Sequence, residues 1–180
     1  MIRPIEVQEC DQRIQKAGNL IDEKKYKEAI SSLKRIQATN KSLIGRSAYL
    51  RMGLHSYLGL AFYHLDGVEG SETDTFLLSA VEHFNQTLAI KDTAENVLFM
   101  RAKCHDYLDN FELAKKDYEK VIALNPSAES AHSFLGLLME NEGHIEKAKE
   151  LYKTALVLDA CDELSAERLA KLSEKGSNKL

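Results

Sequence analysis

The stretch Ala-Lys-Lys-Asp-Tyr at residues 114–118 decides the fold, because Ala-Lys-Glu-Leu-Tyr repeats its pattern 34 residues later, at residues 148–152. In the other direction, the same offset relates residues 114–118 to residues 80–84. Each copy has a small residue, an aromatic residue and an aliphatic residue at positions i, i+4 and i+8. This spacing places the three side chains on one face of a helix. The sequence therefore predicts three successive helices of one kind.

A second helix is predicted before each of these helices. Each of these preceding helices carries a small residue, namely Gly59, Ala102 or Gly136, where close approach of the two helices requires it. Turn residues follow, including Gly67 and Gly143. Each unit is therefore predicted to be a pair of antiparallel helices joined by a turn.

These residues resemble the tetratricopeptide repeat, a helix–turn–helix unit of 34 residues with the same small and aromatic positions. The resemblance implies an all-α fold, an α-solenoid of about four helix–turn–helix repeats with a C-terminal capping helix. We expect a single domain over residues 1–176, followed by a loose tail at 177–180. The predicted repeats and cap occupy residues 4–41, 43–92, 95–128, 129–161 and 162–175.

The second repeat is longer than the family pattern. Part of the excess is expected at residues 42–51, which would lengthen the next first helix. The rest is expected as a polar, acidic insertion near residues 67–74. Because lengthening a loop costs little free energy, we favour a tolerated surface insertion over a contact loop.

Composition agrees with a helical protein and disfavours several functions. Nine glycines and two prolines in 180 residues are too few for the many turns of a β-sandwich. The 24 basic residues are interleaved with 28 acidic ones, giving a net charge of −4, so nucleic acid is not expected as a partner. Neither an apolar run of membrane-spanning length nor the apolar core of a signal peptide occurs, so we expect no membrane insertion and a cytoplasmic location.

Side chains that could carry chemistry are scattered. Cys10, Cys104 and Cys161 are widely spaced and odd in number, so reduced thiols are expected. Cys104 precedes His105, but no further ligand follows at metal-binding spacing, and His105 and His132 occupy positions that the repeat usually buries. No catalytic or phosphate-binding motif occurs. We therefore expect no enzyme activity, no metal site and no cofactor.

The resemblance implies a concave groove lined by the first helix of each repeat, which usually binds an extended peptide or a helix. Aromatic, amide and hydroxyl side chains suit such binding, whereas an ordinary solvated face is the alternative. Acidic residues near Lys103 favour a neutral or mildly basic partner segment. The predicted groove residues are Ser56, Leu60, Tyr63, His64, Asn96, Phe99, Lys103, Asp106, Tyr107, Ser130, Ser133, Leu137, Glu140 and Asn141.

One subclass of the family clamps the C-terminal carboxylate of chaperone tails with a Lys, an Arg and Asn residues. Here Asn96 and Met100 occupy the positions of the two cations. Ile14, Gly18 and Tyr57 replace the remaining clamp residues. Because a buried carboxylate would lack charged partners, we expect no binding of such tails.

The leading hypothesis is a non-enzymatic protein–protein interaction module that acts as an adaptor or co-chaperone-like scaffold without a carboxylate clamp. The alternative is a structural scaffold that self-associates into a homo-oligomer, motivated by an apolar face at Leu164, Leu169 and Leu172. RNA binding is the least favoured hypothesis, because the sequence carries no basic stripe.

Overall fold

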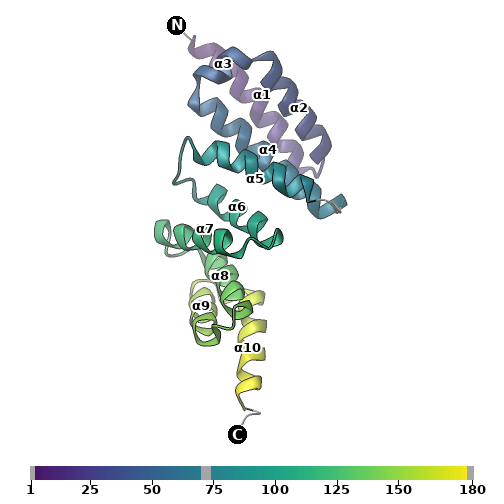
Figure 1. Ribbon diagram of the computed structural model, residues 1–180. Helices are drawn as coiled ribbons and strands as arrows, with labels where there is room; N and C mark the ends of the chain where they lie inside the picture. The colour runs from purple at the N-terminus through teal and green to yellow at the C-terminus, as the bar shows by residue number, and fades with distance from the viewer. Residues whose placement is uncertain (1–2, 70–73, 178–180) are drawn as a thin grey trace. The chain divides into compact units, whose positions relative to one another are not determined.

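The computed structural model describes residues 3–69 and 74–177 of the chain. Within these ranges the chain forms ten helices and no strand, which confirms the predicted all-α class (Figure 1). Packing divides the chain into two compact units, Met1–Asp109 and Asn110–Leu180, and each is described by itself. The single domain expected over residues 1–176 stays a prediction.

The helices follow one another with short connections in both units. The first unit contains α1 (Pro4–Asp22), α2 (Tyr26–Thr39), α3 (Lys41–Arg46), α4 (Ala48–Glu69), α5 (Thr75–Leu88) and α6 (Glu95–Tyr107). The second unit contains α7 (Phe111–Leu124), α8 (Glu129–Asn141), α9 (Ile145–Leu158) and α10 (Glu163–Ser177).

The extra length of the second repeat is arranged differently from the prediction. Residues 42–51 do not lengthen one helix, because Ser47 is extended, with φ −110° and ψ 108°, and separates α3 from α4. The Ser47 hydroxyl accepts a hydrogen bond of 3.3 Å from the backbone N–H of Leu50, in the first turn of α4. At its other end α4 continues through Gly67 to Glu69, so the first residues of the predicted insertion are helical. Residues 70–73 lie outside the described residues.

The predicted aromatic residues lie in the core of their units. In the first unit, the ring of Phe84 is 1% exposed and packs against Gly59 of α4. In the second unit, Tyr152 is fully buried and packs against Gly136 of α8 in the same way. A Cβ atom added at Gly59 or Gly136 would lie 2.5 or 2.8 Å from the facing ring, which explains why glycine occupies both crossings.

Candidate functional site

A cleft of about 420 Å³ opens in the first unit between α2, α4, α5 and α6. We call it the tyrosine cleft, because three tyrosines contribute to its walls. Its lining residues are Tyr26, Tyr63, His64, Asp66, Gly67, Val68, Leu77, Lys103 and Tyr107.

Helix geometry explains why these side chains converge. Tyr63 and Gly67 lie one turn apart on the long helix α4, and Lys103 and Tyr107 are spaced in the same way on α6. Tyr26 is the first residue of α2, directly after a turn in which Lys24 has a positive φ of 59°. The cleft therefore gathers the ends of several helices.

The aromatic rings of the cleft form a connected series. Tyr26 stacks on His64 with ring centroids 5.5 Å apart, and His64 meets Tyr63 edge-on at 5.2 Å. Tyr63 in turn lies 6.3 Å from Tyr107. These separations are typical of favourable aromatic pairs. Tyr107 is 63% exposed, so the series ends in an aromatic residue that is open to solvent.

Three rings of the cleft, those of Tyr63, His64 and Tyr107, have pKa values shifted in the direction that keeps them uncharged at neutral pH. Burial raises the pKa of Tyr63, and the neighbouring Tyr63 hydroxyl, followed by burial, raises that of Tyr107. The pKa of His64 lies below its usual 6.5, because of burial and, secondarily, the ammonium of Lys103. That ammonium lies 5.4 Å from the centroid of the Tyr63 ring. Lys103 and Asp66 are therefore the two charged residues among those that line the cleft.

Asp66 is the acidic member of the lining. Its Oδ1 atom is buried and has no hydrogen-bond partner within the part of the chain that the structure describes. Burial, followed by the nearby carboxylate of Asp74, raises the pKa of Asp66. At one edge of α4, Lys27 forms a 2.6 Å ion pair with Glu69, which ties the first turn of α2 to the last turn of α4.

Four of the predicted groove residues, Tyr63, His64, Lys103 and Tyr107, line the tyrosine cleft. Sequence reasoning missed Tyr26, because it begins the second helix of its repeat, whereas the predicted groove is lined by first helices. It missed Asp66, Gly67 and Val68 for another reason. The sequence predicts a turn at Gly67 and an insertion near residues 67–74, whereas α4 continues to Glu69.

The other predicted residues of the first unit are placed differently. Ser56 is partly buried, and its Oγ lies 3.4 Å from Oγ1 of Thr87 on α5. Leu60 and Phe99 are partly buried, and Asn96 is exposed. Asp106 is partly buried, and its pKa is raised by burial and by Asp109, with the Lys103 ammonium acting in the opposite direction.

In the second unit, α10 covers two of the predicted groove residues. Ser133 is 1% exposed and is hydrogen-bonded to Asp162 and to Ser165 of α10. Glu140 accepts two hydrogen bonds from Arg168 of α10, at 2.9 and 2.6 Å. The expectation that Ser133 and Glu140 face an open groove is therefore wrong, because α10 satisfies both polar side chains.

The remaining predicted residues of the second unit are more accessible. Asn141 is exposed, Ser130 and Leu137 are partly buried, and the Ser130 hydroxyl donates a hydrogen bond to Glu129.

The apolar face that motivated self-association lies on α10 itself and is partly covered by α8 and α9. Leu172 is 5% exposed, and Leu164 and Leu169 are partly buried. Since α10 packs on α8 and α9, this face contributes to the core of its own unit.

Three positions at which the resemblance places clamp residues, Ile14, Gly18 and Tyr57, lie in contacts between α1 and its neighbours. Ile14 is fully buried, and a Cβ atom added at Gly18 would lie 2.5 Å from the ring of Tyr57. The Tyr57 hydroxyl donates a 2.5 Å hydrogen bond to Gln15. The Tyr57 ring therefore occupies the space beside Gly18, where the clamp subclass has an asparagine.

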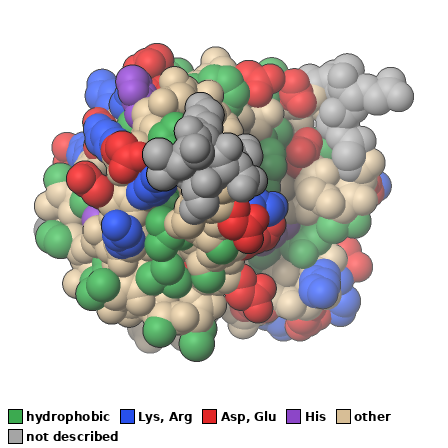
Figure 2. Space-filling model, turned by 90° about the horizontal axis from the view of Figure 1, so that it is seen from below, with side chains coloured by type: hydrophobic (Ala, Val, Ile, Leu, Met, Phe, Trp, Pro, Cys, Tyr) green, Lys and Arg blue, Asp and Glu red, His purple; other side chains and the backbone are tan. Residues whose placement is uncertain are grey.

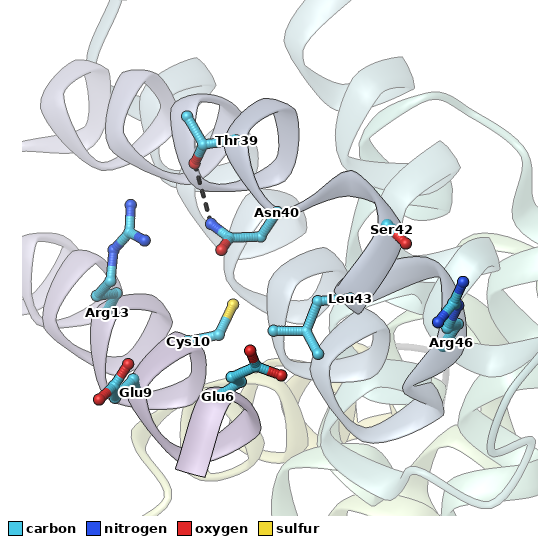
Figure 3. Close-up of a pocket in the computed structure, with 9 residues that line it drawn as sticks. All are labelled: Glu6, Glu9, Cys10, Arg13, Thr39, Asn40, Ser42, Leu43 and Arg46. Carbon is cyan, nitrogen blue, oxygen red and sulfur yellow. Dashed lines mark hydrogen bonds between the residues drawn. The ribbon is translucent and has the colours of Figure 1, made fainter. Parts of the chain in front are cut away.

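A second hollow of about 390 Å³ lies where α1 meets the end of α2 and α3 (Figure 3). Basic and acidic side chains surround it, including Arg13, Arg46 and Glu9. Asn40 donates a 2.9 Å hydrogen bond to Thr39 at its edge. Cys10 also lines it, and burial raises the pKa of this thiol. The thiol is therefore protonated at neutral pH and is not an activated nucleophile.

A pair of histidines joins α4 to α5. The Nδ1 atoms of His55 and His83 are 3.0 Å apart and the rings stack. Burial and then His55 lower the pKa of His83 to about 4. The sequence did not indicate this pair, because the two residues lie 28 positions apart on different helices. His105 and His132 are buried, as predicted.

Residues 3–69 and 74–177 contain neither a metal-binding cluster nor a membrane-spanning helix. No group of three or more His, Cys, Asp or Glu side chains is placed to bind a metal ion. None of the helices there combines the length and hydrophobicity needed to cross a bilayer. On the face drawn in Figure 2, acidic, basic and hydrophobic side chains are interspersed.

Successive helix pairs with a small residue at the crossing define a helical-repeat solenoid, a class whose stacked repeats create extended binding surfaces. Residues 95–128, which contain α6 and α7, match the family model of the tetratricopeptide repeat. Residues 95–128 are therefore a tetratricopeptide repeat, and the chain has the fold of a tetratricopeptide-repeat solenoid.

Comparisons with known proteins agree with this assignment. The chain is 31% identical over 136 residues to the peptidyl-prolyl cis-trans isomerase FKBP4 of Bos taurus, which covers 72% of this chain and 28% of that protein. It therefore spans less than a third of the length of this relative. In fold, it resembles Pseudomonas aeruginosa PilF, with a TM-score of 0.73, 20% identity, and coverage of 94% of this chain and 69% of PilF.

A third similar structure contains a bound peptide. It is the second tetratricopeptide-repeat domain of human RPAP3 in complex with the HSP70 peptide SGPTIEEVD. The TM-score is 0.57 at 20% identity, and the alignment covers 68% of this chain and 98% of the RPAP3 domain.

Proposed function

We propose that this chain is a non-enzymatic protein–protein interaction module that binds a segment of a partner protein in the tyrosine cleft. The observation that carries the proposal is the series of aromatic rings ending in Tyr107, which is 63% exposed beside a cleft of about 420 Å³. Exposed tyrosines beside pockets are typical binding hot spots, because they bury a large area at a small entropic cost.

The family supports this proposal at a coarser level. Tetratricopeptide repeats are interaction modules, and the RPAP3 domain with the same fold was solved with a peptide bound. For this chain we propose an adaptor or co-chaperone-like scaffold without a carboxylate clamp, because Tyr57 packs beside Gly18. The proposal includes a neutral or mildly basic partner segment and a cytoplasmic location. The exposed Asn96 and the partly buried Leu60 and Phe99 would extend the contact.

A pair of tyrosine variants tests the proposal. Tyr107→Ala removes the exposed ring of the cleft, and Tyr49→Ala removes a ring that is 55% exposed but lies outside it. Affinity purification from native extracts, with each variant as bait, should lose the partner for Tyr107→Ala and retain it for Tyr49→Ala. Far-ultraviolet circular dichroism should show unchanged helix content for both. Equal recovery of the partner by Tyr107→Ala and wild type would refute the cleft as the binding surface.

A further inference from the structure

We propose that the tyrosine cleft recognises a basic side chain, lysine or arginine, of the partner segment, with Asp66 as its counter-ion and tyrosine rings as its walls. This inference rests on the proposed function, which it deepens by naming the chemistry of the partner. It is carried by three features of the cleft: an unsatisfied carboxylate oxygen, uncharged aromatic rings, and an ammonium group that already lies over one of these rings.

The first feature is the Oδ1 atom of Asp66. It is buried, and within the described residues it has no hydrogen-bond partner. A carboxylate oxygen that is removed from water without a donor is destabilised, and a charged donor corrects this most effectively. The raised pKa of Asp66, caused by burial and by Asp74, agrees with an anion that lacks compensation. Asp66 lines the cleft, so a guanidinium or ammonium group bound there would supply the opposite charge to this carboxylate.

The second feature is the set of rings around this carboxylate. Tyr26, Tyr63 and Tyr107 line the same cleft, and the faces of tyrosine rings attract cations. His64 lies between two of these tyrosines in the ring series, and its lowered pKa leaves it uncharged at neutral pH. It therefore does not repel an incoming cation.

The third feature is Lys103, whose ammonium lies 5.4 Å from the centroid of the Tyr63 ring. This contact demonstrates that a cation can lie over a ring of the cleft. Lys103 also repels a second cation, so replacing it should affect the binding of a basic probe in the opposite direction to replacing Asp66. Neutralising Asp66 should weaken the binding of a basic probe, whereas replacing Lys103 by methionine should strengthen it.

The test is an NMR titration of the full chain with short peptides. The probes are acetyl-Ala-Arg-Ala-amide, its lysine analogue, and the neutral isostere in which citrulline replaces arginine. The proteins are wild type, Asp66→Asn, Lys103→Met, and Glu119→Gln, which neutralises an exposed carboxylate outside the cleft. Ring resonances of Tyr26, Tyr63 and Tyr107 report binding in the cleft, and thermal melting verifies that each variant is folded.

We expect the arginine and lysine peptides to shift these ring resonances and the citrulline peptide to have little effect. Asp66→Asn should weaken binding of the basic peptides about tenfold, because the bound cation loses its counter-ion. Glu119→Gln should leave affinity unchanged, and Lys103→Met should raise it. Equal binding of the citrulline peptide, or an unchanged affinity in Asp66→Asn, would overturn the inference.

The titration and the affinity purification can fail independently. If Tyr107→Ala loses the partner but basic peptides do not bind in the cleft, the interaction function stands and the role of Asp66 is refuted. If basic peptides bind through Asp66 but Tyr107→Ala retains the partner, the cleft recognises cations and the proposed partner surface is wrong.

Discussion

Two glycines in the same helix should respond in opposite directions to the same substitution. Gly53 and Gly59 both lie within α4, away from its ends. A Cβ atom added at Gly53 would meet Cγ2 of Ile14 at 3.9 Å, an ordinary van der Waals contact. A Cβ atom added at Gly59 would lie 2.5 Å from Cε1 and 2.6 Å from Cδ1 of Phe84.

The magnitudes follow from two terms. Replacing glycine by alanine inside a helix stabilises it by about 0.8–1 kcal/mol, because the unfolded chain loses conformational freedom. This term is common to both sites. At Gly59 it is opposed by overpacking, which costs roughly 1–3 kcal/mol. The Phe84 ring is 1% exposed and has little room to move, so we place this cost at about 2–3 kcal/mol.

We therefore expect Gly53→Ala to stabilise the protein by about 1 kcal/mol and Gly59→Ala to destabilise it by about 1–2 kcal/mol. Urea denaturation followed by circular dichroism measures both as shifts of the unfolding midpoint. The double variant Gly59→Ala/Phe84→Leu should be less destabilised than the sum of the two single variants, because the smaller side chain removes the clash. Equal stability changes at Gly53 and Gly59 would refute the close packing of Phe84 on α4.

Three further predictions concern the cap, the histidine pair and the thiols. Arg168→Leu should destabilise the second unit by about 2 kcal/mol, because Glu140, whose side chain is 11% exposed, loses its charged donor. Faster amide hydrogen exchange in α10 would report this loss of stability. The free energy of unfolding should fall as the pH is lowered from about 6.5 towards 4, because His83 binds a proton in this range in the unfolded chain but, with a pKa of about 4, not in the folded one. Thermal melting at a series of pH values should show a weaker pH dependence for His83→Gln than for wild type. Iodoacetamide should label exposed Cys161 in the native protein and reach Cys104, whose pKa burial raises to about 12, only after unfolding, as mass spectrometry can verify.

The repeat pattern predicted the helices well because it depends on local spacing. Residues such as Ala114 and Tyr118 reveal a helical face within one or two turns, and the structure buries both. The break at Ser47 was missed because a single serine with extended backbone does not interrupt the apolar pattern around it. The helical continuation through Gly67 was missed because glycine followed by acidic residues is typical of turns.

The site was predicted less completely, for a different physical reason. Tyr63, His64, Lys103 and Tyr107 could be assigned because all four lie on first helices of the repeat. The unsatisfied oxygen of Asp66 depends on the neighbours that bury it, which local spacing does not describe. The contact of α10 with Ser133 depends likewise on residues about 30 positions apart. Predicting a capping helix did not indicate which side chains it would cover.

The contact between α10 and Glu140 bears on the side-chain chemistry that the corresponding position of the first unit favours. Glu140 lies 34 residues after Asp106, so the two acids occupy the same position in successive repeats. In the second unit, Arg168 of α10 binds Glu140 through two hydrogen bonds, so a basic side chain on a helix satisfies this repeat position within the chain itself. In the first unit, Asp106 is partly buried with a raised pKa, and the Lys103 ammonium offsets part of that shift. If Asp66 is the counter-ion of the cleft, Asp106→Asn should weaken binding of the arginine peptide less than Asp66→Asn does, because Asp106 does not line the cleft and Lys103 offsets part of its charge.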